Sequence, residues 1–314
     1  MSTTTAAAAA PATRGGGEIR PGRFLRDPRH YQITVLTALL GYAILGLEAS
    51  IHLPHVVTIV GTALATQWVL VRRLGAGSFD PRSPLTSALS LSLLLRTNDI
   101  GLAALAAVIT VAAKFLLRVD GKHVFNPTNF GLAAMLLLTD RAWVSPGQWG
   151  SAALLGFLLA CVGGMVVHRA ARSDVTYAFL ASYTALVCGR ALWLGDPLAV
   201  PFHHLASGAF LIFAFFMISD PRTTPDSRAG RMLFAALVAL GAGFVHFVLY
   251  QPNGLLWSLV CAAPLVPLIN RFLPGRRYEW SRHATHDTRG LTHATHRSTV
   301  SIRTPSYARS STVH

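Results

Sequence analysis

Apolar stretches follow one another along most of the chain, and this succession constrains the fold more than any other feature. They run from about residue 31 to 273, and most approach the roughly 20 residues that cross a bilayer core. Only 13% of the 314 residues are charged, against about 25% in a soluble domain. The sequence therefore predicts an all-α polytopic membrane protein.

Basic residues divide the loops between these stretches into two groups. With an arginine-rich N-terminal segment inside, the loops assigned to the cytoplasmic side carry most of the charge: Arg72, Arg73, Arg82, Arg118, Lys122, Arg169, Arg172, Arg222 and Arg228. The outer loops carry only Arg141. Because Lys and Arg favour the cytoplasmic side, both termini are expected there. The pattern predicts about ten transmembrane helices, at about 31–47, 55–71, 83–98, 100–117, 126–139, 150–168, 175–194, 203–219, 231–250 and 255–272.

The two ends of the chain are basic and of low complexity. Five arginines fall in residues 1–30 and eight in residues 271–314. We expect disordered cytoplasmic tails at 1–30 and 274–314, without a cleavable signal peptide. The second tail repeats "HATH", and metal binding is the alternative to simple disorder for its histidines His283, His286, His293 and His296. No compact basic domain exists, so the predicted partner is the lipid bilayer and not nucleic acid.

The spans divide into two groups of five, repeat one at about 31–139 and repeat two at about 150–272. In each group the third span begins with small polar residues, turns apolar and ends in an acid: "SPLTSALSLSLLLRTND" at 83–99 and "HHLASGAFLIFAFFMISDP" at 203–221. The fifth spans open with "FNPTNFG" and "YQPNG". Since an odd number of spans reverses direction, the sequence predicts two inverted five-helix repeats, a pattern typical of transport folds.

Polar residues at the ends of these matching segments form the candidate site. Pro127 and Pro252 free backbone groups that cannot be left in lipid. Neighbouring asparagines either satisfy these groups, face a ligand, or simply cap the helices, as Asn does well. The residues predicted to bind a cofactor or line a pathway are Asn98, Asp99, Asn126, Asn129, Asp220, Asn253 and His246.

Charged and titratable residues near the spans have simpler alternatives. Asp99 and Asp220 would each cap the following helix. His246 is an intramembrane titratable group, and a haem there would need a second histidine at matching depth. The other histidines considered lie at span ends: His168, His203 and His204. Lys114 and Arg190 are expected to snorkel toward the membrane surface. The three cysteines form no CxxC pair, so no metal site is predicted.

Four segments resemble the NqrB/RnfD family of ten-span membrane subunits of ion-pumping oxidoreductases. They are "SALSLSLLLRTND", "KHVFNPTNFG", "GAFLIFAFFMISDPRTTP" and "NGLLWSLVCAAPLVPLIN". The resemblance implies electron transport at a bacterial cell membrane, with other membrane or redox subunits as partners. The short length, "DPRHYQI" and "GKHVFNPTNFGLAAMLLL" are similar to the short members encoded in enediyne antibiotic clusters, which implies a supporting role in enediyne biosynthesis.

The resemblance also bears on flavin. In the energy-converting members, FMN is esterified to a threonine of a GAT motif in the outer loop after the fifth span. Here that loop reads "TDRAWVSPGQWG" (139–150) and contains no GAT. Covalent FMN is therefore not expected, whereas a non-covalent flavin, either FMN or riboflavin, between helices stays open.

Alternative functions remain at this stage. A small-solute transporter or channel would use the same inverted-repeat architecture, and a membrane scaffold for biosynthetic enzymes is a third interpretation. No dinucleotide-binding glycine pattern and no cysteine cluster for iron–sulfur ligation occurs. The catalytic residues are unknown. We expect no stand-alone enzyme, but a non-catalytic subunit of an oxidoreductase complex.

Overall fold

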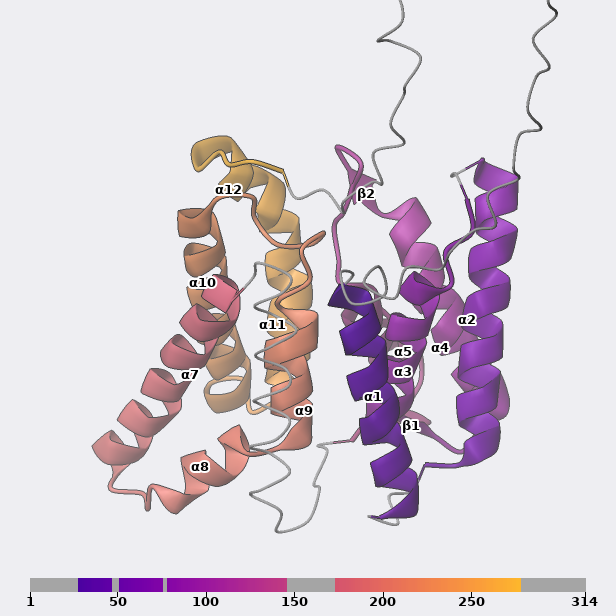
Figure 1. Ribbon diagram of the computed structural model, residues 1–314. Coiled ribbons are helices and arrows are strands. Elements are labelled where there is room, and N and C mark those ends of the chain that lie inside the picture. The colour runs from indigo at the N-terminus through magenta and orange to yellow at the C-terminus, as the bar shows by residue number, and fades with distance from the viewer. Residues whose placement is uncertain (1–27, 47–50, 76–77, 146–172, 278–314) are drawn as a thin grey trace, which may run out of the picture. The chain divides into compact units, whose positions relative to one another are not determined.

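The computed structural model describes residues 28–46, 51–75, 78–145 and 173–277 (Figure 1). Both predicted tails, except for their inner ends, and the span predicted at 150–168 lie outside the described residues. The first part of the chain contains five helices: α1 (Pro28–Leu45), α2 (Leu53–Leu74), α3 (Arg82–Leu94), α4 (Ile100–Leu116) and α5 (Pro127–Leu138). In this part α2 packs against α3 and α4, α1 against α3, and α4 against α5.

Four short strands depart from the all-α expectation within a mostly helical chain. Strand β1 (Leu95–Thr97) pairs antiparallel with β4 (Ala142–Val144), and β2 (Arg118–Val119) pairs with β3 (Lys122–His123). The β2–β3 turn is Asp120–Gly121, and both residues have positive φ, 50° and 73°. Asp-Gly is a favoured dipeptide for such tight hairpin turns. Apolar periodicity does not reveal pairs this short.

The second part contains α7 (Ser173–Leu194), α8 (Ala199–Leu205), α9 (Gly208–Ile212), the π-helix Phe213–Met217, α10 (Arg228–Phe247), α11 (Gly254–Ala262), a 3₁₀ turn (Ala263–Leu265) and α12 (Val266–Phe272). Helix α10 packs against both α7 and α11. An aromatic cluster joins α7 to α9 and the π-helix: the ring of Phe179 lies 5.9 Å from Phe210 and 5.2 Å from Phe213. This cluster anchors the broken segment.

Among the described residues, four helices are long and apolar enough to cross a bilayer: α2, α7, α10 and the continuous stretch Gly254–Phe272. A fifth crossing results if α8 and Gly208–Met217, which bend by 52° at their junction, form one broken span. Helices α4 and α5 are apolar but shorter. Every predicted span among the described residues contains a helix or a broken helix pair, although the span predicted at 83–98 is helical only to Leu94 and ends in β1. The count of ten stays a prediction.

Helices α4 and α5 approach closely because Gly131 lacks a side chain. A Cβ at this position would overlap Oγ1 of Thr110 on α4. Helices α10 and α11 approach in the same manner, since a Cβ on Gly241 of α10 would overlap Oγ of Ser258 on α11. Gly131 and Ser258 are each the fifth residue of their helix, and Thr110 and Gly241 each lie six residues before the last. The two contacts thus occupy equivalent helix positions, but where one contact has glycine the other has a hydroxyl residue.

Candidate functional site: a buried junction of α5, the π-helix and α11

The π-helix Phe213–Met217 leaves carbonyl groups that the surrounding helices satisfy. Its wider i→i+5 bonding is rare and is found frequently at functional sites. The carbonyl of Ala214 accepts a hydrogen bond from Oγ1 of Thr176 on α7, at 3.0 Å. The carbonyl of Met217 accepts one from Nδ2 of Asn126, at 3.2 Å. Side chains from two other segments therefore hold this irregular turn in place.

Asn126 performs two tasks with one amide group. Its Oδ1 accepts a hydrogen bond from the backbone N–H of Asn129, at 3.1 Å, and so caps α5. Pro127 follows as the first helical residue, where its missing N–H is harmless. The Nδ2 of Asn126 is committed to Met217, so the cap and the bridge use opposite ends of the side chain. Asn126 is 7% exposed, and the capping interpretation describes only half of its role.

Asn129 connects α5 to α11. Its Nδ2 donates to the carbonyl oxygen of Leu256, at 3.1 Å, and the residue is 1% exposed. Its Oδ1 is buried and has no hydrogen-bond partner within the described segments. A buried acceptor without a partner costs about 1–3 kcal/mol, and this oxygen therefore retains an unused capacity to accept a hydrogen bond.

The remaining predicted residues lie elsewhere. Asn98 is exposed. Asp99 caps α4, with Oδ1 accepting from the N–H of Gly101 at 2.8 Å, and it pairs with Arg141 at 3.2 Å. Asn253 precedes α11 in a left-handed conformation (φ 61°) and makes no side-chain cap bond. The predicted site residues therefore form no single cluster: Asn126 and Asn129 come together, and the others do not join them.

The expectation that Asp220 caps α10 is wrong. Ser227 caps this helix, its Oγ accepting from the N–H of Gly230 at 3.0 Å. Asp220 lies seven residues earlier along the chain, and its Oδ1 accepts instead from the N–H of Arg222, at 3.0 Å. An acid at the end of an apolar run thus begins a turn here and not a helix.

Partly buried charges connect the β2–β3 hairpin to the loop that follows Asp220. Lys122 pairs with Asp226 at 2.7 Å and donates to the carbonyl of Thr224 at 3.0 Å. Burial, followed by the positive charges of Arg222 and Arg118, lowers the pKa of His123 from 6.5 to about 3. Since a guanidinium only donates, the 3.4 Å contact from Arg222 Nη1 makes His123 Nε2 an acceptor, and the imidazole is neutral.

Lys114 does not snorkel as expected. It is only 4% exposed, and its Nζ donates to Oγ of Ser83 on α3, at 3.1 Å. The hydrogen bond holds this side chain between α3 and α4, and a hydropathy pattern gives no signal for such a contact.

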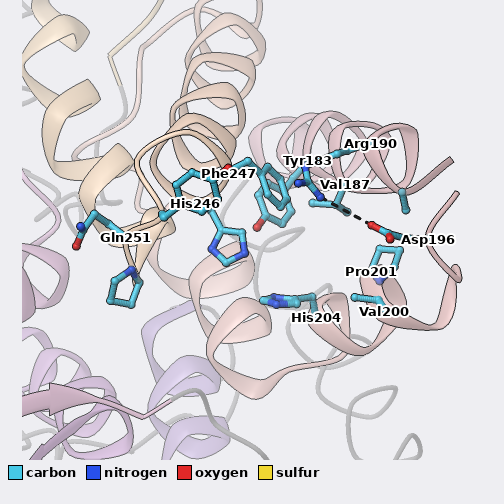
Figure 2. Close-up of a pocket in the computed structure, with 13 residues that line it drawn as sticks. Tyr183, Val187, Arg190, Asp196, Val200, Pro201, His204, His246, Phe247 and Gln251 are labelled. Carbon is cyan, nitrogen blue, oxygen red and sulfur yellow. Dashed lines mark ion pairs between the residues drawn. The ribbon is translucent and has the colours of Figure 1, made fainter. Parts of the chain in front are cut away.

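His246 lies in a cavity of about 550 Å³ at the ends of α7 and α10 (Figure 2). Helix α8 supplies His204, whose ring centroid lies 5.4 Å from that of His246 in an edge-to-face arrangement. Arg190 stacks over Phe247 at 4.4 Å and lies 3.9 Å from Asp196. The sequence placed His204 at a span end. Because the chain bends between α8 and Gly208, His204 meets His246.

Long apolar helices, a broken segment ending in a π-helix and a buried amide junction define a helical integral membrane protein. Residues 108–279 match the NQR2, RnfD, RnfE family, and because this match covers more than half of the chain, the chain belongs to that family. The resemblance to NqrB and RnfD found in the sequence is thereby confirmed. Membership of the enediyne group stays a prediction.

Two relatives illustrate the similarity. The RnfD subunit of the ion-translocating oxidoreductase complex of Citrobacter koseri is 33% identical over 146 residues, 45% of this chain and 38% of the relative. The corresponding subunit from Escherichia coli O139:H28 is 30% identical over 141 residues, 44% of this chain and 35% of the relative. The chain therefore matches little more than a third of these relatives' length.

Proposed function

We propose that the chain is an RnfD-like membrane subunit that takes part in electron transport at the bacterial cell membrane. The observation that carries this proposal is the family match, which extends from α4 to the end of α12 and includes the α5–α11 junction. Two relatives of the chain are described as subunits of an ion-translocating oxidoreductase complex. Other membrane or redox subunits would then deliver and remove the electrons.

A non-covalent flavin at the junction is part of the proposal. The unpartnered Oδ1 of Asn129 supports it, because this oxygen would accept an N–H from the flavin ring. Asn126 is already committed at both ends, so Asn129 is the residue that would hold the group. A bound flavin would supply one- and two-electron transfer. Covalent attachment remains unexpected, since the loop after α5 contains no GAT motif.

We further infer that the two parts of the chain are inverted repeats. Helices α2, α4 and α5 pack in the same order as α7, α10 and α11, and the exchanged glycine and hydroxyl contacts occupy matching positions. Asn129 bonds to Leu256, which lies 127 residues later. Asn126 and Asn253 are separated by the same offset. A residue that contacts its own counterpart lies on a two-fold axis, which supports an axis at Asn129.

Flavin content tests the electron-transport proposal. Protein purified in mild detergent should show flavin absorbance, and denaturation should release the flavin without leaving a fluorescent band at the protein's mass. Asn129→Ala should lower occupancy at least tenfold while insertion into the membrane persists. The exposed Asn98→Ala is the matched control and should retain flavin. Absence of flavin from the wild-type protein, isolated with its partners, would contradict the cofactor proposal.

A small-solute transporter is the second candidate, and the 52° break between α8 and α9 favours it. Discontinuous helices are typical of transporter binding sites. Solute flux into liposomes by a flavin-free protein would select this function.

The topology has a separate test. Cysteine labelling at 195–201 and at 285 should report opposite sides of the membrane if about ten spans place both termini in the cytoplasm.

A further inference from the structure

A small cavity lies between the start of α2 and the end of α3, away from the junction. It has a volume of about 20 Å³, enough for one small species. Its polar lining comes from His52 and His55 at the beginning of α2 and from Ser92, Arg96 and Thr97 at the end of α3 and in β1. His52 is exposed, so the cavity has a route to the outside.

Two of the side chains that line the cavity have polar atoms without a hydrogen-bond partner in the described segments. Ser92 is 3% exposed, and its Oγ is buried without a hydrogen-bond partner within the described segments. Both ring nitrogens of His55 are buried and equally without partners there. Buried hydroxyl and imidazole groups are rarely left unpaired in native structures, so a species in the cavity is expected to receive their hydrogen bonds.

Arg96 brings a positive charge to the cavity. Its Nη1 donates to the carbonyl oxygens of Ser92, at 3.1 Å, and Leu95, at 2.9 Å. Across the described residues it has no ion pair, and the nearby carboxylate of Asp99 is engaged with Arg141 and with the start of α4. A guanidinium has five N–H donors, so several remain for a further acceptor.

We propose that this cavity binds a small monovalent anion of the size of chloride. The hydroxyl of Ser92 and an N–H of His55 would donate to the ion, and the guanidinium of Arg96 would balance its charge. A water molecule would satisfy the hydroxyl and the imidazole but not the charge. The small size of the cavity favours a single-atom ion, and Arg96 repels cations.

Thermal stability provides the test, because a ligand that binds only the folded state raises the melting temperature with its concentration. The purified full chain is heated in sodium chloride and in sodium gluconate at equal ionic strength, which keeps screening constant. Chloride should raise the melting temperature by several degrees. Identical melting temperatures would mean that water fills the cavity and would overturn the proposal.

Two variants locate the effect. Ser92→Ala removes one donor and should weaken the chloride response at least tenfold in midpoint concentration, and Arg96→Gln should abolish it. The exposed Arg228→Gln removes the same charge elsewhere and should retain the wild-type response. A response that is unchanged in both Ser92→Ala and Arg96→Gln would overturn the site.

A third variant asks whether the chain supplies the negative charge itself. Glu48 lies outside the described residues and close in sequence to His52. Chloride dependence that appears only in Glu48→Gln would assign the counter-charge to this carboxylate and overturn the proposal. Broadening of the ³⁵Cl NMR line by the wild-type protein, reduced in Ser92→Ala, would support binding independently of unfolding.

Discussion

The starts of α5 and α11 are similar in sequence, yet their asparagines have different structural roles. Asn126 has an extended backbone (φ −61°, ψ 125°), caps α5 and bridges to the π-helix. Asn253 is left-handed (φ 61°, ψ 31°), and its carbonyl, not its side chain, accepts from Leu256 N–H at 2.9 Å. Asparagine tolerates this left-handed region better than most residues do. Equal offsets in sequence therefore preserve the placement of a residue without preserving its chemistry.

The glycine–hydroxyl contacts between α4 and α5 and between α10 and α11 provide the strongest test of whether the two parts of the chain are equivalent. Gly131→Ser should destabilise the protein by about 3 kcal/mol, because it overpacks against Thr110. Combining it with Thr110→Gly recreates the arrangement that α10 and α11 use. The double variant should recover most of the melting temperature and membrane yield. Failure of this rescue would show that the two contacts are not equivalent.

The asparagines themselves give the next largest effect. Asn126→Ser retains a capping oxygen but removes the 3.2 Å hydrogen bond to the Met217 carbonyl, which keeps only the 3.4 Å bond from the N–H of Asp220. The expected cost is about 1.5 kcal/mol. Asn253→Gly should change stability by only a few tenths of a kcal/mol, since glycine adopts positive φ freely. Melting temperatures of the two variants, measured side by side, check the difference. Equal losses would place Asn253 in the same role as Asn126.

The loss of folding stability at acidic pH should depend on the β2–β3 hairpin. Among the described residues, only the first part of the chain contains such a hairpin. His123 has a folded-state pKa of about 3, below the unfolded value of 6.5, so the unfolded chain takes up a proton first as the pH falls. The stability that neutral His123 contributes is present above pH 6.5 and is lost toward pH 3. The loss should be about 1 kcal/mol over the first pH unit below 6.5.

His123→Asn should flatten this part of the pH–stability curve, measured as melting temperature between pH 7 and 5. The exposed His203→Asn, in the second part, is the matched control and should leave the slope unchanged. An unchanged slope in His123→Asn would assign the acid response to another group.

The smallest effect concerns the caps of α4 and α10. Asp99→Ala and Ser227→Ala should each reduce stability by about 1 kcal/mol, because each removes the acceptor for an N–H in the first helical turn. Asp99→Asn should be nearly neutral, since Asn caps equally well and the pair with exposed Arg141 contributes little. Denaturation curves check the ranking, and a large loss in Asp99→Asn would point to a role beyond capping.

Much of the described architecture follows from the sequence, because apolar runs and their polar ends mark helices directly. Asn126 was placed correctly at the start of α5, and Asp99 at the start of α4. The partners of Asn126 and Asn129 could not be predicted, since Met217 and Leu256 contribute backbone carbonyls, which every residue has. The cap of α10 was missed because Ser227 lies beyond an acid that ends the apolar run more conspicuously.

The cavity around His246 was missed for a different reason. His204 meets His246 only because the chain bends by 52° between α8 and α9, and hydropathy treats the two helices as one span. Lys114 shows the same limit, since its burial depends on the space between α3 and α4. Which side chains meet depends on how the helices pack, and the order of apolar and polar residues along the sequence does not specify this.

The π-helix Phe213–Met217 also limits how this segment tolerates length changes over evolution. A π turn accommodates one residue more than an α turn, so it can be regarded as an insertion retained within a helix. Deleting one residue would restore ordinary winding and rotate everything that follows by about 100°. The Met217 carbonyl would then turn away from Asn126. Homologues should therefore conserve the number of residues here more strictly than their identity.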